Sequence, residues 1–351
     1  MSSTHGGINP WALKEAGIDP EDVKDFSVSI NPVSLPLSIQ DVIRRSALYR
    51  YPDSRSQALV EALSVEYGPP HDEIMVVNGT SQAIFLIAGS YISPGDTTLI
   101  AGPTYGEYRD AAEVSGARVV EYRARAEDEF KPNCQKIQEM IRLEKPKVFW
   151  TCSPNNPTGS WMEDQQLEAL SEACKEVGCL MVLDEAYRCF AAPGLLSEEF
   201  LSGVVHLRSM TKDFCIPGLR LGWLRADPDD ITKLLLRQPE WSVSSPAQDA
   251  GVACMNQIDY FRGSWAETRR LTGEMANGLK SLGLRVYPTA ANFLLVRIGD
   301  DAEVKKLGKE LWRNLIQVRD CASFELEGYI RIGTRSAADI ETLLSVLKRS
   351  L

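Results

Sequence analysis

The sequence predicts an α/β fold in which a large domain with a mostly parallel, seven-stranded sheet accompanies a smaller α+β domain. Between about residues 75 and 225, short apolar runs alternate with amphipathic helical stretches, which is typical of a parallel sheet covered by helices. After about residue 246 this alternation gives way to two long helical stretches and then to short strands. A length of 351 residues agrees with two domains, or with one large domain and a smaller partner.

The expected strands of the large sheet are short apolar runs bounded by glycine, proline and polar residues. Amphipathic stretches with helical periodicity separate them, notably residues 80–91, 105–114 and 163–177. We therefore expect strands at residues 74–77, 98–101, 118–122, 148–152, 180–183, 204–209 and 221–225.

The C-terminal part is expected to begin with two helices, at about residues 247–262 and 264–281. Short strands should follow at residues 284–287, 293–297 and 329–332, with a final helix near residues 337–347. These expectations divide the chain into three segments. They are an N-terminal arm or part of the small domain at 1–45, a large domain at 46–245 and a small domain at 246–351.

The composition argues against several classes of function. A formal net charge of −10 argues against nucleic acid or an anionic membrane as a partner. No run approaches the roughly 18 unbroken apolar residues of a membrane span, and the first ten residues lack the layout of a signal peptide, so we expect a cytoplasmic protein. Eight cysteines without a C-x-x-C pair, and only three histidines, argue against a disulfide framework or a metal site.

Polar motifs follow four of the expected strands, at the end where a parallel sheet collects its ligands. Each motif alone has an ordinary structural explanation, as a helix cap, a turn or a solvated lysine. Their occurrence together, each at a strand end, points instead to a site. The motifs are Gly79-Thr80-Ser81, then Asn155-Asn156-Pro157-Thr158-Gly159, then Asp184 with Tyr187, and then Ser209, Thr211 and Lys212 with Pro217-Gly218 and Arg220.

The series NPTG, D-x-A-Y, S-x-x-K and P-G-x-R-x-G resembles the fold-type I pyridoxal-phosphate enzymes of the class I/II aminotransferase superfamily, over essentially the whole chain. The resemblance implies an aspartate aminotransferase-like fold and pyridoxal 5'-phosphate as the cofactor. Lys212 would then bond covalently to the cofactor, and Asp184 would pair with its protonated ring nitrogen, which makes the ring an electron sink. Tyr187 and Asn156 would hydrogen-bond the phenolic oxygen of the ring.

The same resemblance assigns further residues to the cofactor. Tyr105, in GPTYGEY, matches an aromatic residue that stacks on the ring, although a buried aromatic at a turn is the alternative. Tyr51, in YRYPD, resembles a tyrosine that reaches the cofactor phosphate of the other subunit, which implies a homodimer with shared active sites. A phosphate prefers helix-terminal N–H groups, hydroxyls and an arginine. The residues that fit these needs are Thr80, Ser81, Ser209 and Arg220.

An arginine of the small domain binds the substrate carboxylate in this superfamily, and Arg331 alternates with apolar neighbours in an expected strand. Arg335 is the nearby alternative. The chain ends, including HGGINP and VRDCASFELEGYIRIGTRS, resemble the branch that acts on threonine phosphate, which is itself close to the histidinol-phosphate aminotransferases. By this resemblance the phosphate and carboxylate of a phosphorylated substrate would contact His5, Asn31, Asn156, Arg319 and Arg331.

Ordinary alternatives remain for three of these residues. His5 can be terminal slack, Asn31 can be a turn residue before Pro32, and Arg319 can form a surface salt bridge with Asp320 or Glu325.

The resemblance implies decarboxylation of L-threonine O-3-phosphate to (R)-1-amino-2-propanol phosphate in cobalamin biosynthesis. An aminotransferase acting on histidinol phosphate, or a decarboxylase of serine phosphate, is the close alternative, because the core motifs serve every branch. A protein that keeps the fold only as a binding module is a third possibility. The presence of Lys212, Asp184 and Arg220 together argues against it.

Overall fold

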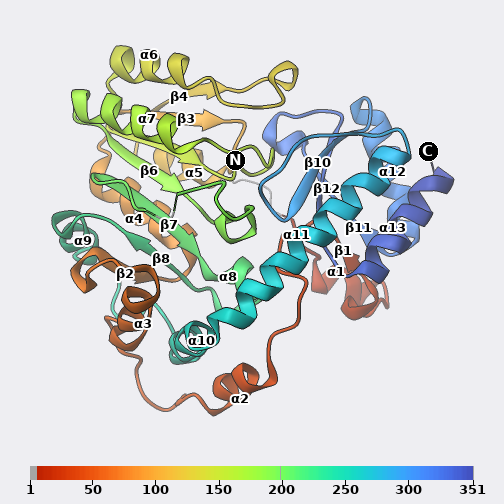
Figure 1. Cartoon of the computed structure of the whole chain (residues 1–351), viewed down its shortest axis with the longest axis horizontal. Coiled ribbons are helices and arrows are strands. Elements are labelled where there is room, and N and C mark those ends of the chain that lie inside the picture. Colours follow the sequence, from red (N-terminus) through yellow and green to blue (C-terminus); the bar gives the residue numbers. More distant parts are fainter. Residues whose placement is uncertain (1–5, 198, 351) are drawn as a thin grey trace.

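The computed structural model describes residues 6–197 and 199–350, and its large part is built on a seven-stranded sheet (Figure 1). The strand order is β2-β8-β7-β6-β5-β3-β4, and only β8 runs antiparallel to its neighbours. All seven expected strands are present, with ends that shift by one residue at most. They are β2 (Ile74–Val77), β3 (Thr97–Gly102), β4 (Arg118–Arg123), β5 (Val148–Cys152), β6 (Leu180–Asp184), β7 (Val204–Ser209) and β8 (Gly222–Arg225).

Helices cover both faces of this sheet. On one face, α4 (Gly79–Tyr91), α5 (Glu107–Val114) and α9 (Pro228–Leu235) bury one apolar cluster. On the other face, α6 (Cys134–Glu144) and α7 (Asp164–Val177) bury a second cluster. Because both faces are covered, the central strands β5 and β7 are buried along their whole length rather than at every second residue, and β5 is almost entirely apolar. This double cover leaves the carboxyl ends of the parallel strands as the accessible edge.

The small domain is an antiparallel sheet covered by three helices. Its strand order is β12-β13-β10-β9, and the strands are β12 (Arg319–Asp320), β13 (Tyr329–Gly333), β10 (Phe293–Arg297) and β9 (Arg285–Val286). β9 is shorter than the expected strand at 284–287, because only Arg285 and Val286 pair with β10. The covering helices are α11 (Ile258–Ser281), α12 (Asp301–Arg313) and α13 (Ala337–Ser350).

The long helix α11 joins the two parts of the molecule (Figure 1). Phe261 and Trp265, near its start, pack into the core beside the large sheet, whereas Leu271 and Met275 pack into the small domain. The sequence places the break before this helix at residue 263. The structure places it at Asn256 and Gln257, where the Gln257 backbone leaves the helical region.

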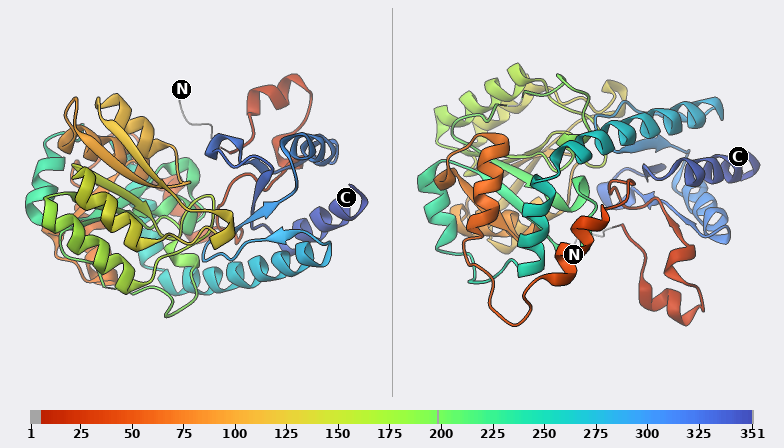
Figure 2. Two further views of the ribbon diagram at one scale, coloured as in Figure 1. Left: turned by 90° about the horizontal axis from the view of Figure 1, so that it is seen from above. Right: turned by 60° about the horizontal axis from the view of Figure 1, so that its bottom comes forward.

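The first 45 residues divide between the two parts. β1 (Lys24–Asp25) pairs in parallel with β11 (Ile316–Gln317), and Figure 2 shows this N-terminal stretch, in red, beside the small domain. In contrast, α2 (Leu37–Arg45) packs on α10 (Ser245–Met255), which also contacts α3 (Gln57–Tyr67). Both α2 and α10 therefore lie with the large part, on the other side of the expected divisions at 45/46 and 245/246.

A glycine explains the close packing of α10. An added Cβ at Gly251 would lie 2.8 Å from a Leu59 methyl carbon, so only glycine allows the two helices to approach this closely.

Among the described residues, no helix is long and apolar enough to cross a membrane, and no group of three or more acidic, histidine or cysteine side chains could hold a metal. All eight cysteines lie in the described part of the chain and are free thiols.

Candidate active site

A cavity of about 280 Å³ lies at the carboxyl ends of the large-sheet strands, facing the small sheet. Most motifs that follow the large strands contribute to its wall. β13 and the segment after β12 close the opposite side. The predicted residues that line it are Thr80, Ser81, Tyr105, Asn156, Asp184, Tyr187, Lys212, Arg220, Arg319 and Arg331. Ligands of parallel α/β sheets collect at this edge, so the topology brings together residues that are up to 251 positions apart.

Lys212 lies in α8 (Met210–Asp213), a single helical turn that follows β7. Its ammonium nitrogen Nζ lies 5.1 Å from the centroid of the Tyr187 ring. Within residues 6–197 and 199–350, no hydrogen bond or ion pair occupies the Lys212 side chain. An amine in a cavity, next to an aromatic face and without a fixed partner, is suited to bond with a ligand.

Asp184 ends β6 and is buried at the floor of the cavity. The Tyr108 hydroxyl donates a hydrogen bond to its Oδ2 at 2.7 Å, and the Ala186 N–H donates to Oδ1 at 2.9 Å. Burial raises the pKa of Asp184, while the Tyr108 hydrogen bond and the Lys212 charge oppose that rise in pKa. The carboxylate is therefore held in place and poorly solvated, which favours a cationic ligand group beside it.

Tyr108 is a part of this arrangement that the sequence did not single out. It lies in the first turn of α5, three residues after Tyr105, and its ring stacks on Trp150 at 5.6 Å between centroids. Burial raises the pKa of Tyr108 well above its usual value, so the phenol remains a donor to Asp184. The spacing of the two tyrosines in GPTYGEY is the signal that could have identified it.

Three more predicted residues line the cavity beside Lys212. Tyr105 packs edge-on against Tyr108, and its hydroxyl lies 3.4 Å from Ser81 Oγ. Burial raises the pKa of Tyr105 to about 12. Tyr187 is buried, with 5% of its surface exposed, and burial raises its pKa above the usual value. The Asn156 side-chain oxygen accepts a hydrogen bond from Arg331, which connects the two domains directly.

The start of α4 gathers groups suited to an anion at one end of the cavity. Gly79 has φ +71°, and an added Cβ there would lie 2.7 Å from Nη2 of Arg220. The glycine therefore lets the Arg220 guanidinium lie against the N-terminus of a helix of 13 residues. Thr80 and Ser81 add hydroxyls at the same place. Helix N–H groups, hydroxyls and an arginine together favour a phosphate.

Two buried arginines line the opposite side. Arg319 and Arg331 are register partners on β12 and β13. Nη2 of Arg331 donates to Ser27 O at 2.7 Å, whereas its Nε has no hydrogen-bond partner in the described part of the chain. Nη2 of Arg319 donates to Ser323 Oγ at 2.5 Å. Burial, and then repulsion by Arg331, lowers the pKa of Arg319. Both features favour an anionic ligand between these side chains.

Arg335, the alternative to Arg331, does not line this cavity. Its Nε donates to Asp339 Oδ2 at 3.0 Å, so its charge is already paired.

Three of the predicted site residues that the structure describes are not in the cavity wall. Ser209 lies behind it, with its hydroxyl 2.8 Å from that of Thr211, which does line the cavity. Tyr51 is 78% exposed and stacks on Trp241 with ring centroids 4.4 Å apart. Asn31 is buried, and its side chain is bonded to α8 and α11 instead of the cavity. His5 lies outside the described residues.

Comparisons with known proteins agree with this geometry. Residues 25–347 match the family model of aminotransferase class I and II. The chain is 32% identical to a threonine-phosphate decarboxylase of Salmonella typhimurium, over 100% of this chain and 97% of that protein. It is 28% identical to a histidinol-phosphate aminotransferase of Methanocaldococcus jannaschii, over 95% of this chain and 90% of that protein.

Solved structures give the same fold. A histidinol-phosphate aminotransferase of Sinorhizobium meliloti, in complex with pyridoxal-5'-phosphate, superimposes with a TM-score of 0.88 at 21% identity, covering 98% of this chain and 94% of that chain. An aspartate aminotransferase of Thermus thermophilus with maleate gives a TM-score of 0.82 at 22% identity, covering 97% of this chain and 94% of that chain. The family match and the full-length relative show that this chain belongs to the aminotransferase class I and II family of pyridoxal-phosphate enzymes.

Proposed function

We propose that this chain decarboxylates L-threonine O-3-phosphate to (R)-1-amino-2-propanol phosphate, with pyridoxal 5'-phosphate as cofactor, in cobalamin biosynthesis. The observation that carries the proposal is the pair of buried arginines, Arg319 and Arg331, on one side of a cavity that has Lys212 on the other. Two neighbouring guanidinium groups suit a substrate with two anionic groups, such as a phosphate and a carboxylate. The full-length relative from Salmonella typhimurium supports this choice.

The residues in the cavity fit the cofactor. The close approach of Arg220 to Gly79 forms a cradle for a phosphate at the start of α4, and a Cβ at Gly79 would fill this cradle. Asp184 provides a buried carboxylate for a protonated ring nitrogen, and Lys212 provides the amine. Tyr105 provides an aromatic face, and Ala186 lines the cavity with a small side chain. When bound, the cofactor supplies an electron-withdrawing ring that accepts the electron pair left by a departing group.

The chain's own residues then hold the substrate and move protons. Arg319 and Arg331 bind and orient the two anionic groups of the substrate, and the orientation determines which bond at Cα breaks. Loss of carbon dioxide breaks the bond between Cα and the carboxylate carbon. Lys212 donates the proton that replaces the carboxylate at Cα. Asp184, held in place by the Tyr108 hydrogen bond, would pair with the positive ring nitrogen of the cofactor.

The remaining predicted cofactor contacts are part of the same proposal. Asn156 and Tyr187 hydrogen-bond the phenolic oxygen of the ring, while Thr80 and Ser81 contact the cofactor phosphate. Thr211 lines the cavity where Ser209 does not, so we assign it a direct phosphate contact and place Ser209 behind it.

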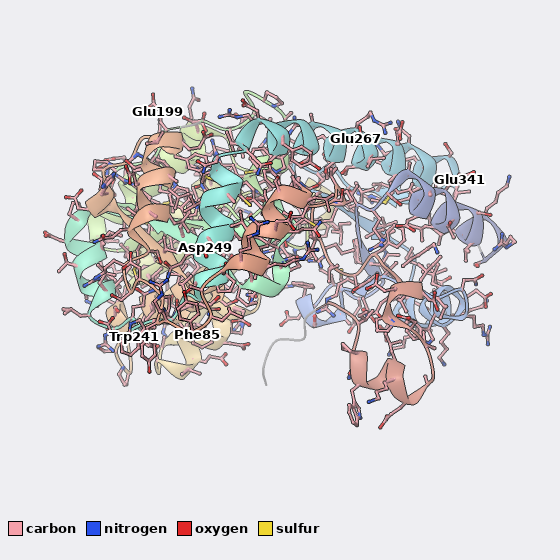
Figure 3. All side chains as sticks on the ribbon, turned by 90° about the horizontal axis from the view of Figure 1, so that it is seen from below. Phe85, Glu199, Trp241, Asp249, Glu267 and Glu341 are labelled. Atoms are coloured by element: carbon pink, nitrogen blue, oxygen red, sulfur yellow. The ribbon has the colours of Figure 1, made fainter. Side chains whose placement is uncertain are left out.

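We also propose a homodimer in which Tyr51 of one subunit reaches the cofactor phosphate of the other. Exposed apolar side chains gather near Tyr51: Leu48 is 79% exposed, Tyr49 81% and Trp241 50%. Figure 3 shows Trp241 and Phe85 on the same side of the molecule. Exposed apolar patches of this kind mark interaction surfaces. Tyr51 does not line the cavity of its own chain, but in a dimer it would reach the cavity of the second subunit.

His5 is proposed to contact the substrate phosphate. The neighbouring Gly6 lines the cavity, and an added Cβ there would lie 2.3 Å from Ser27 O. The N–H of Gly7 donates to Ser27 Oγ at 2.8 Å, which fixes the arm beside the cavity.

The test is to incubate the purified protein and cofactor with L-threonine O-3-phosphate and no oxo acid. Carbon dioxide and aminopropanol phosphate are expected. Amino-group transfer from histidinol phosphate to 2-oxoglutarate, without decarboxylation, would instead establish the second candidate, which the relative from Methanocaldococcus jannaschii favours. L-serine O-phosphate in the first assay tests the third candidate.

A further inference from the structure

One short segment of the chain contacts both Lys212 and Arg331. Residues 27–30 line the cavity as an irregular segment that begins with a turn and a bend and lies between the two domains. At one end, Ser27 O accepts a hydrogen bond from Nη2 of Arg331 at 2.7 Å. At the other end, the N–H of Asn31 donates to Lys212 O at 2.9 Å. The proposed cofactor lysine and substrate arginine are therefore linked through five consecutive residues.

The Asn31 side chain reinforces the Lys212 end. Its Nδ2 donates to Asp213 O at 2.9 Å and to Ser264 Oγ at 2.8 Å. Its Oδ1 accepts from Thr268 Oγ1 at 3.1 Å and from the Val33 N–H at 3.0 Å. The residue is 1% exposed, and these contacts use both amide hydrogens, while Oδ1 shares the Thr268 hydroxyl hydrogen with Ser264 O. The amide thus bonds α8 to α11, the helix that joins the two domains.

The helix that carries Lys212 has little support of its own. α8 contains only four residues, and isolated helices of this length do not form stably. Its last carbonyl, Asp213 O, also accepts from Trp265 Nε1 at 2.9 Å. The position of Lys212 therefore depends on donors from elsewhere in the chain, namely the backbone N–H and the side-chain amide of Asn31 and the Trp265 indole.

We propose that Asn31 is a positioning residue that fixes Lys212 relative to Arg331, so that the lysine amine and the bound substrate meet in the reacting geometry. This inference rests on the proposed roles of Lys212 and Arg331, and it replaces the expected direct contact between Asn31 and substrate. A displacement of about 1 Å in such a geometry can cost about 100-fold in rate. Loss of the Asn31 bonds should therefore affect catalysis more than substrate binding.

The test variant is Asn31→Asp, which has nearly the same shape but presents an oxygen to Asp213 O in place of a donor. The matched control is Thr272→Val, because Thr272 is also buried on α11 but bonds Thr334 instead of α8. The measurements use the holoenzyme. They are kcat and KM for threonine phosphate, the pH titration of the visible absorbance of the bound cofactor, and the Tm. This absorbance reports protonation of the nitrogen that Lys212 contributes, so it detects a displaced lysine without any substrate.

We expect Asn31→Asp to lower kcat by about 10- to 100-fold, with little change in KM, and to shift the midpoint of the absorbance titration. Thr272→Val should lower the Tm alone. An unchanged kcat and titration in Asn31→Asp, or the same changes in Thr272→Val, would overturn the proposal. Should Asn31→Asp fail to fold, Asn31→Ser is measured in its place, because it also removes the amide donor to Asp213 O. It should then shift the titration, and an unshifted titration in that variant overturns the proposal.

The titration also separates this inference from the proposed function. If the wild-type protein does not decarboxylate threonine phosphate, the reaction assignment fails. A shifted titration in Asn31→Asp then still supports the positioning role.

Discussion

Replacement of Gly79 by alanine tests the anion-binding end of the site. The backbone at Gly79 has φ +71°, and an added Cβ would lie 2.7 Å from Nη2 of Arg220. Arg220 is exposed and its guanidinium is the far end of a flexible side chain, so it can move away. We therefore expect Gly79→Ala to remain folded but to displace Arg220 from the start of α4.

The expected magnitude follows from the lost contact. A hydrogen bond to a charged group contributes about 1.5–3 kcal/mol, which corresponds to an increase in the Kd of pyridoxal phosphate of about 10- to 150-fold. A side chain at positive φ adds roughly 1–2 kcal/mol of strain. This strain lowers the stability of the folded protein whether or not the cofactor is bound.

The assay is a titration of the cofactor-free protein with pyridoxal phosphate, followed by absorbance or tryptophan fluorescence. Gly218→Ala is the matched control. Gly218 lies two residues before Arg220, has no atom within 4 Å of an added Cβ, and lacks a positive φ. The control should bind the cofactor like the wild type. Equal affinities in Gly79→Ala and the wild type would refute the assignment of this end of the cavity to the cofactor phosphate.

Three further predictions follow from the structure. Burial raises the pKa of Asp213 from its unfolded value near 3.8 to about 7, so the folded state binds more protons and loses stability as the pH rises from about 4 to 7. In urea denaturation at pH 8, Asp213→Asn should then have a larger free energy of unfolding than the wild type. This difference in free energy should shrink towards pH 4, and a difference that does not depend on pH would contradict the prediction. Arg319→Gln should raise KM for threonine phosphate by about 10- to 150-fold, whereas Arg335→Gln, outside the cavity, should not, and equal effects count against the site. Tyr51→Phe should weaken cofactor binding only when the protein is a dimer. Mixing this variant with Lys212→Ala should restore activity, because each hybrid dimer then has one site with both Lys212 and the Tyr51 of the other subunit. If no activity returns on mixing, the sites are not shared.

Local patterns were sufficient to predict the sheet and the motifs at its edge. Strands β2 and β5 end where their mostly apolar runs end, because burial on both faces favours continuous apolar residues there. The break between α10 and α11 was misplaced by several residues. No proline or glycine marks Asn256 and Gln257, so the end of the helix depends on packing against α2 and α3.

The candidate site was predictable wherever a motif lies at a strand end. Asp184, Lys212 and Asn156 line the cavity as expected, because parallel topology gathers the carboxyl ends of strands. Tyr108 was missed because a tyrosine inside an amphipathic helix gives no signal of its own. Only the fold shows that its hydroxyl lies 2.7 Å from the Asp184 carboxylate.

The sequence by itself determined the fold class and the family, and it predicted the residue types of the candidate site, because these depend on local periodicity and on short motifs. Only the tertiary structure decided which residues act together across the chain. Asn31 bonds to Asp213, 182 positions away, and Arg331 bonds to Asn156, 175 positions away. A residue before a proline looks like a turn in any sequence. The three long-range hydrogen bonds of the Asn31 side chain exist only because the interdomain helix and the lysine-bearing turn meet around it.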